Sequence, residues 1–191
     1  MEKIDKGFRV IFAGLGGHGA LVFGELLTEA VARRYNYASF VPNYAPSMRG
    51  GESESIVVAS NEEIDSPASF EAEAVVATSP SAFRLAEKRV SPGGILIVDD
   101  SIICEKAERK DIKVFYIPAR KIASEEGNPL ISNFILMGAY LEATKTLPVE
   151  IVEETLESTS KGTSRERLLS ANKRALHEGI RLIANYSQQP L

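Results

Sequence analysis

Tyr44 and Arg49 are the side chains of this sequence best suited to bind an anion, because both lie in a short run with rigid points. The run reads Asn-Tyr-Ala-Pro-Ser-Met-Arg-Gly-Gly from 43 to 51, with Pro46 as one rigid point and Gly50 and Gly51 as the other. A planar guanidinium beside glycines can approach a carboxylate or phosphate closely, since no neighbouring Cβ obstructs it. The tyrosine adds an aromatic face and a hydroxyl. The run therefore predicts a binding loop, and the simpler alternative is a surface arginine in a turn.

A glycine-rich turn upstream is the second candidate for anion binding. Gly14, Gly16 and Gly19 have G-x-G-x-x-G spacing, with Gly17 and His18 between them. Glycines at such a turn can let an anionic ligand approach the free N–H groups at the start of the next helix. The alternative is that they only let that helix pack closely on the strand. A dinucleotide site would also need an acidic residue at the end of the second strand, and residues 38–42 contain none. NAD binding is therefore disfavoured.

Several other residues carry chemistry that the sequence alone does not assign. His18 is expected to be solvated, or to donate to a phosphate or a carbonyl. Asp99 and Asp100 end an apolar run, where carboxylates cap the next turn more often than they do acid–base work or bind Mg²⁺. Cys104 is expected to be a small buried apolar residue, and His177 a surface or interface residue.

Two asparagines fall inside helical patterns. Asparagine is mildly unfavourable in a helix, because its side chain competes for backbone hydrogen bonds. Each of Asn133 and Asn172 is therefore expected to make a specific hydrogen bond.

Length and composition predict one domain over residues 1–191 and narrow the range of partners. A chain of 191 residues can bury about 70% of its unfolded surface. The formal net charge is −4 and no dense block of Lys and Arg occurs, so nucleic-acid binding is not expected. One cysteine permits neither an internal disulfide nor a cysteine cluster for a metal. The charged N-terminal residues do not have the pattern of a secretory signal, and the longest apolar stretch, 134–141, is too short to span a bilayer. We therefore expect a cytoplasmic protein with no membrane contact.

Apolar runs and helical patterns alternate along the chain. Strands are predicted at 8–13, 38–41 (stopped by Pro42), 55–59, 74–78, 95–98 (after a turn at 91–94) and 113–117. Helices are predicted from 19 onward and at 80–88, 120–126, 130–145, 149–158 and 164–186. This order predicts an α/β fold, Rossmann-like, with a mostly parallel sheet, helices on both faces and a helical C-terminal third.

The motifs together resemble the gamma subunit of 2-oxoacid:ferredoxin oxidoreductases, the group of the pyruvate, 2-oxoglutarate and 2-oxoisovalerate enzymes. The resemblance spans nearly the whole chain, and the segment from Tyr44 to Gly51 is its most specific part. The matching positions are Gly14, Gly16, Gly17 and Gly19; Tyr44, Pro46, Arg49, Gly50 and Gly51; Val57, Val58 and Ser60; and Ile64, Ser66 and Pro67. His18, Asn43, Ala45 and Ser47 depart from the family pattern.

The resemblance implies a subunit that is inactive alone. Its complex would decarboxylate a 2-oxoacid on thiamine diphosphate, pass electrons through iron–sulfur clusters to ferredoxin and transfer the acyl group to coenzyme A. The thiamine diphosphate, Mg²⁺ and clusters would lie in alpha, beta and delta-type partner subunits, and this chain would bind no cofactor alone. Its residues 44–51 would form a loop that contacts the substrate, CoA or a partner subunit. The isolated chain would self-associate. The alternative from another class is a free-standing nucleotide-binding module that uses the turn at 14–19.

Overall fold

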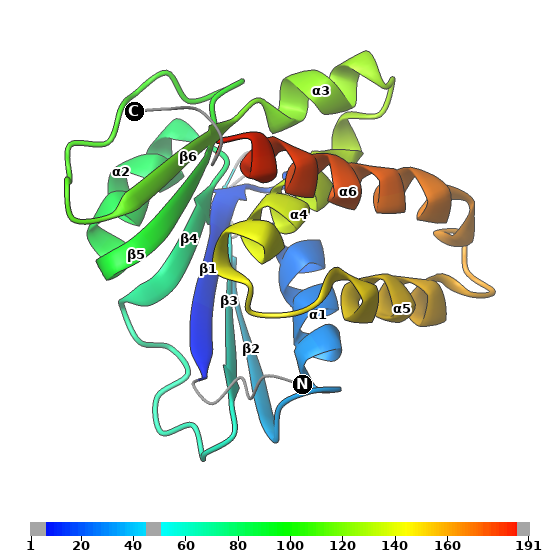
Figure 1. Cartoon of the computed structure of the whole chain (residues 1–191), viewed down its shortest axis with the longest axis horizontal. Helices are drawn as coiled ribbons and strands as arrows, with labels where there is room; N and C mark the ends of the chain where they lie inside the picture. Colours follow the sequence, from blue (N-terminus) through cyan, green and yellow to red (C-terminus); the bar gives the residue numbers. More distant parts are fainter. Residues whose placement is uncertain (1–6, 45–50, 187–191) are drawn as a thin grey trace.

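The centre of the protein is one six-stranded sheet, described by a computed structural model over residues 7–44 and 51–186 (Figure 1). Its strand order is β2-β3-β1-β4-β5-β6. The strands are β1 (Phe8–Leu15), β2 (Tyr37–Tyr44), β3 (Glu52–Ser60), β4 (Ala72–Ala77), β5 (Val90–Asp99) and β6 (Lys113–Ile117). The pairs β1/β4, β4/β5 and β5/β6 are parallel, and β3 runs antiparallel to both of its neighbours. The prediction of a mostly parallel sheet is confirmed, and β3 is the departure from a Rossmann pattern.

Helices cover both faces of this sheet, as predicted. They are α1 (Ala20–Val31), α2 (Pro80–Arg89), α3 (Ala119–Glu125), α4 (Ser132–Thr144), α5 (Val149–Ser160) and α6 (Leu169–Tyr186), with short 3₁₀ helices η1 (Pro129–Ile131) and η2 (Glu166–Leu168). Helix α2 packs on one face, and α1 and α4 pack on the other with α6 behind α4 (Figure 1). Local sequence sets several of these ends: Ser79 accepts a hydrogen bond from the N–H of Ala82 (3.2 Å), and Pro80 begins α2.

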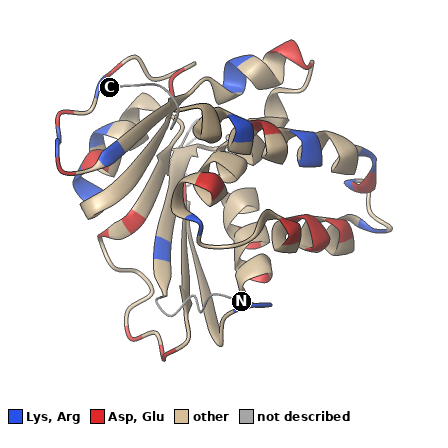
Figure 2. Cartoon of the chain, viewed as in Figure 1, with Lys and Arg blue, Asp and Glu red and all other residues tan. Residues whose placement is uncertain are grey.

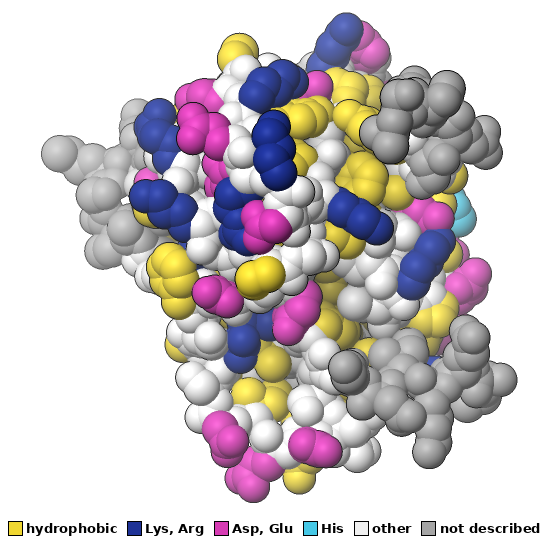
Figure 3. All heavy atoms as spheres, turned by 60° about the vertical axis from the view of Figure 1, so that its left-hand side comes forward, with side chains coloured by type: hydrophobic (Ala, Val, Ile, Leu, Met, Phe, Trp, Pro, Cys, Tyr) yellow, Lys and Arg dark blue, Asp and Glu magenta, His cyan; other side chains and the backbone are white. Residues whose placement is uncertain are grey.

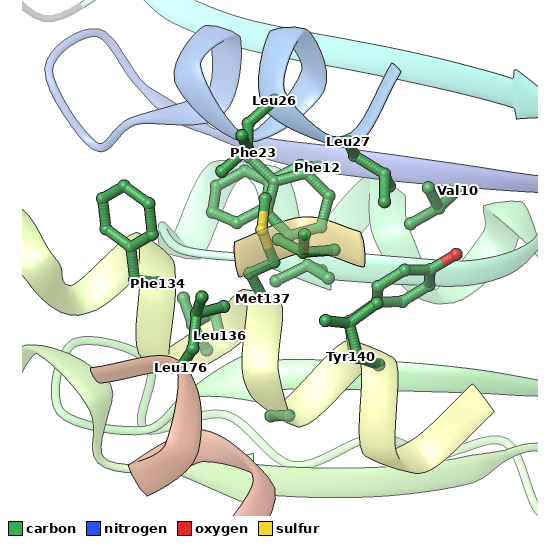
Figure 4. Packing of buried hydrophobic residues seen from close by; sticks show 14 of the residues in the cluster. Val10, Phe12, Phe23, Leu26, Leu27, Phe134, Leu136, Met137, Tyr140 and Leu176 are labelled. Atoms are coloured by element: carbon green, nitrogen blue, oxygen red, sulfur yellow. The ribbon is translucent and has the colours of Figure 1, made fainter. Parts of the chain in front are cut away.

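Alternation along β1 divides its side chains between two apolar cores. Val10 and Phe12 point toward α1 and α4, and Ile11 points toward α2. In Figure 4 Met137 of α4 reaches toward the rings of Phe12 and Phe23, whose centroids lie 4.5 Å apart. These contacts fix the position of α1, and with it the glycine turn that precedes α1.

Helices α4 and α6 approach so closely that glycine is required on both. A Cβ on Gly138 would lie 1.9 Å from the carbonyl oxygen of Leu176, and a Cβ on Gly179 would lie 1.9 Å from that of Ile135. Residues 132–141 of α4 are all buried, because the sheet covers one side of the helix and α6 covers another.

Two local predictions from proline and glycine were wrong. Pro42 does not stop β2, which continues to Tyr44. Strand β2 lies at the edge of the sheet and has no further strand on its outer side, so the missing N–H of a proline is tolerated there. Residues 91–94 do not form a turn before the strand but lie inside β5. Val90 pairs with Ala72 and Ile95 with Ala74, so the extra residues form a bulge, in which Gly93 has φ +78°.

The Ile-x-Ser-Pro motif at 64–67 is tied to the N-terminal end of β1. Arg9 donates from its guanidinium to the carbonyl oxygens of Ser66 (2.8 Å) and Glu71 (3.2 Å), and its backbone N–H donates to Glu73 (2.7 Å). The glycine turn follows the other end of β1, so this motif holds the connection between β3 and β4 away from the turn.

Charged side chains form local pairs on the surface. Acidic residues line α5 and basic residues line α6 (Figure 2), and His177 contacts Glu153 at 2.9 Å between these helices while Lys173 pairs with Glu157. On the face that carries α2, acidic and basic side chains are intermixed (Figure 3). Within the described ranges no helix is long and apolar enough to cross a membrane.

Candidate functional site

The two motifs singled out in the sequence lie side by side. Strands β1 and β3 pair so that Gly14 is opposite Ser53 and Leu15 opposite Glu52, which brings the start of β3 to the glycine turn. The N–H of Gly16 donates to the carbonyl oxygen of Gly51 at 2.9 Å. The ring of Tyr44 lies on the same side, 3.7 Å from where a Cβ on Gly16 would be, and is 58% exposed.

The structure describes only part of the predicted arginine loop. Tyr44 ends β2 and Gly51 immediately precedes β3. Arg49 and Gly50 lie outside the described residues, as does Pro46. The described ends of this segment, Tyr44 and Gly51, both lie next to Gly16 of the glycine turn.

Close packing and backbone conformation account for three of the turn's glycines. A Cβ on Gly14 would lie 1.9 Å from Oγ1 of Thr78, and one on Gly19 would lie 2.7 Å from Nδ2 of Asn133. Gly17 and Gly19 have φ values of +90° and +84°, which L side chains rarely adopt. Packing therefore explains Gly14 and Gly19 without a ligand, and anion binding by this turn stays a prediction.

His18 is half-buried and anchored, which corrects the expectation of a solvated ring. Its Nδ1 lies 2.8 Å from the carbonyl oxygen of Thr78, so Nδ1 carries the proton and donates. Burial lowers the pKa of His18, and the positive charge of Arg120 lowers it further. The hydrogen bond to Thr78 and the negative charge of Asp99 raise this pKa, but they do not outweigh the effect of burial. The neutral ring ties the glycine turn to the end of β4.

This lowered pKa predicts a pH dependence of stability. The unfolded chain takes up the proton near the ordinary pKa of 6.5, before the folded protein does, so the free energy of unfolding should fall as the pH drops below that value. His18→Asn keeps a donor near the position of Nδ1 and does not titrate, so its stability should change less between about pH 7.5 and 5.5. Urea unfolding of both proteins at the two pH values is the measurement, and equal pH dependence would contradict the assignment.

A cavity of about 460 Å³ opens beside the glycine turn. One wall is the glycine turn and α1 as far as Glu29. The other walls are η1 with the start of α4, the end of α5, and η2 with the start of α6. Most of the lining is apolar, from residues such as Leu26, Phe134 and Leu156. Three exposed apolar side chains, Val22 (39%), Tyr44 (58%) and Leu130 (69%), surround its mouth.

One polar side chain in the wall of this cavity has a buried oxygen without a hydrogen-bond partner among the described residues. Asn133 is 5% exposed, and its Oδ1 has no hydrogen-bond partner among the described residues. The expectation that Asn133 makes a specific hydrogen bond is therefore wrong for that atom. Asn172 is buried too and lines the same cavity from α6.

The remaining candidates divide into structural and surface residues. Asp99 accepts hydrogen bonds from the N–H groups of Ser101 (3.2 Å) and Arg120 (3.4 Å), which confirms a capping role, and burial raises the pKa of its carboxyl. Oδ1 of Asp100 is buried without a partner in the described part of the chain. Cys104 is exposed rather than buried, because the neighbouring Ile103 takes the core position after β5.

A protein-family model described as pyruvate ferredoxin/flavodoxin oxidoreductase matches residues 9–182. The chain belongs to this family. Both motifs and most of the cavity lining fall inside the matched range. Family membership confirms the expected resemblance, and the alternative of a free-standing nucleotide-binding module receives no support.

Individual relatives of this oxidoreductase family agree in sequence and fold. The chain is 33% identical to the 2-oxoglutarate synthase subunit KorC of Methanocaldococcus jannaschii, covering 90% of this chain and 92% of the relative. It superposes with a TM-score of 0.79 on the keto/oxoacid ferredoxin oxidoreductase gamma subunit of Geobacter sulfurreducens, at 22% identity over 93% of this chain and 99% of the other. It also superposes, with a TM-score of 0.84 and 23% identity, on the 2-oxoglutarate:ferredoxin oxidoreductase of Magnetococcus marinus, which holds 2-oxoglutarate, coenzyme A and succinyl-CoA. That match covers 96% of this chain and 32% of the other.

No metal-binding group emerges from the described residues of this family member. Among residues 7–44 and 51–186, no three His, Cys, Asp or Glu side chains converge as a metal ion would require. The described residues do offer a largely apolar cavity and an adjoining exposed tyrosine. These groups can bind and orient a ligand or a partner.

Proposed function

We propose that this chain is the gamma-type subunit of a 2-oxoacid:ferredoxin oxidoreductase and is catalytic only within its complex. The family match over residues 9–182 is the observation that carries the proposal. In this proposal thiamine diphosphate, Mg²⁺ and iron–sulfur clusters belong to alpha, beta and delta-type partners, ferredoxin accepts the electrons, and the complex is cytoplasmic. The reaction oxidatively decarboxylates a 2-oxoacid and transfers its acyl group to coenzyme A.

We propose 2-oxoglutarate as the substrate of that complex. The support is the KorC subunit of a 2-oxoglutarate synthase, which is similar to this chain over nearly its whole length. Substrate choice is assigned to the thiamine-bearing subunits, because the cavity of this chain has mostly apolar walls rather than a set of cations for a dicarboxylate.

The segment from Tyr44 to Gly51 is the proposed contact with coenzyme A or with the thiamine-bearing subunit. Tyr44 is 58% exposed, and Gly51 is fixed to the glycine turn through Gly16. Arg49 lies between these two residues in the sequence. In this proposal Arg49 supplies the positive charge, and Gly50 and Gly51 allow close approach.

The partner subunits are proposed to cover the exposed apolar side chains at the cavity mouth. Val22, Tyr44 and Leu130 come from three separate elements and meet on one side of the molecule. A stable subunit interface commonly buries well over about 1,000 Å². We expect the isolated chain to self-associate through the same side.

Reconstitution tests the proposed function. The purified chain alone should be colourless and inactive toward 2-oxoacids. Mixed with the alpha, beta and delta-type subunits of its own organism, it should co-elute in one complex and restore CoA-dependent reduction of ferredoxin, faster with 2-oxoglutarate than with pyruvate or 2-oxoisovalerate. The control is the same mixture without this chain. Turnover by the chain alone, or full activity of the control, would overturn the proposal, and a preference for pyruvate would overturn only the substrate.

A further inference from the structure

Residues 61–73, here called the acidic connection, join β3 to β4 and include the start of β4. They contain no Lys, Arg or His, and their exposed acidic residues are Glu62, Glu63, Asp65, Glu71 and Glu73. Figure 2 shows acidic residues on this connection at the lower end of the view, whereas α3 lies at the upper end (Figure 1). Negative charge gathered in this way attracts a positively charged partner and repels nucleic acid or an anionic membrane.

An exposed aromatic ring lies in the acidic connection and is held in place by an arginine. Phe70 is 61% exposed. Arg89 of α2 donates from Nε to the carbonyl oxygen of Phe70 at 3.0 Å, and its guanidinium lies 5.4 Å from the centre of the ring. Arg89 is itself fixed, since its side chain is only 14% exposed and pairs with Glu54 of β3. The ring is therefore positioned before a partner arrives, which lowers the entropy that binding costs.

A second arginine shapes the backbone of the acidic connection. Arg9 of β1 donates to the carbonyl oxygens of Ser66 (2.8 Å) and Glu71 (3.2 Å). At the same end of the sheet Tyr37 is 45% exposed, and it pairs with Ser60, the last residue before the acidic connection. A single exposed aromatic residue would be ordinary on a protein surface. A fixed ring with a second ring at the same end and charges around it has the composition of an interface, in which an aromatic anchor lies within a polar rim.

We propose that the acidic connection docks a partner protein that has an apolar pocket for Phe70 with Lys and Arg side chains around it. The chemistry of this partner follows from the ring and the charges, and its identity as a subunit of the same complex rests on the proposed function. The contact is separate from the cavity mouth, because the acidic connection lies at the N-terminal end of β1 and the glycine turn follows the other end. The chain thus contacts its complex at two ends of the sheet.

The test is the binding of the full-length chain to the partner subunits of its own organism, purified as a complex without this chain. Phe70→Ala removes the ring from an exposed position and should raise Kd at least about tenfold. Phe70→Tyr keeps the ring and should leave Kd unchanged. Glu62→Lys with Glu63→Lys reverses two adjacent exposed charges and should slow association at least about tenfold at low salt, with a smaller difference at high salt.

The matched control is Glu125→Lys with Glu126→Lys, which makes the same change at an exposed pair where α3 ends, at the other end of the molecule. This variant should associate as the wild type does. Equal slowing of the control would show an effect of net charge alone and overturn the docking site. Wild-type Kd and association rate in both Phe70→Ala and the Glu62/Glu63 variant would also overturn it, while the proposed function would stand. If the wild-type chain bound no partner subunit at all, both proposals would fail.

Discussion

Gly138→Ala and Gly179→Ala are each expected to lower the free energy of unfolding by about 3 kcal/mol, the upper end of the usual range for overpacked cores. The added methyl group would meet backbone rather than a movable side chain. It would lie 1.9 Å from the carbonyl oxygen of Leu176 in one case and of Ile135 in the other. Relief therefore requires α4 and α6 to separate, and this breaks the contacts that bury residues 132–141. A loss of this size is a large part of the stability of an ordinary domain.

Urea unfolding measures this effect, with Gly16→Ala as the matched control. A Cβ on Gly16 would meet nothing closer than 3.5 Å, which is an ordinary contact, so that variant should change stability by less than about 1 kcal/mol. If both helix variants lost less than about 1 kcal/mol in the free energy of unfolding, α4 and α6 would not pack as closely as described.

The sheet could be predicted because its signals are local. The run 95–98 is apolar throughout and the run 113–117 is apolar after Lys113, as is typical of strands in a sheet that helices cover on both faces. The helices that cover the sheet show the different spacing of apolar residues that a helix requires. The errors arose where tertiary position overrides local preference. Pro42 is tolerated because β2 is an edge strand, and the glycines at 93–94 open a bulge rather than a turn.

Half of the candidate site could also be predicted, since the glycine turn and the segment after Tyr44 carry family-specific motifs. Their contact through Gly16 and Gly51 follows from the antiparallel pairing of β1 with β3, which no local pattern indicates. The cavity escaped prediction because its walls come from α1, α4, α5 and α6, far apart in the sequence. The one available signal was Asn133, a polar residue at the start of an apolar helix.

Arg49→Lys is expected to lower kcat/KM for coenzyme A in the reconstituted complex about 5- to 150-fold. This corresponds to about 1–3 kcal/mol, because lysine keeps the charge but loses the planar two-point hydrogen bonding of a guanidinium. Steady-state kinetics with the 2-oxoacid and coenzyme A varied in turn is the measurement, and gel filtration checks that the complex still assembles. Arg84→Lys, on α2 across the sheet, is the matched control, since it makes the same change at a 67% exposed side chain.

The pattern of kinetic change assigns the role of Arg49. A raised KM for coenzyme A with normal assembly would indicate that the guanidinium contacts an anionic group of the cosubstrate, such as a phosphate. Loss of assembly would instead place Arg49 against the thiamine-bearing subunit. If Arg49→Ala left both kinetics and assembly unchanged, the segment from Tyr44 to Gly51 would be only a turn.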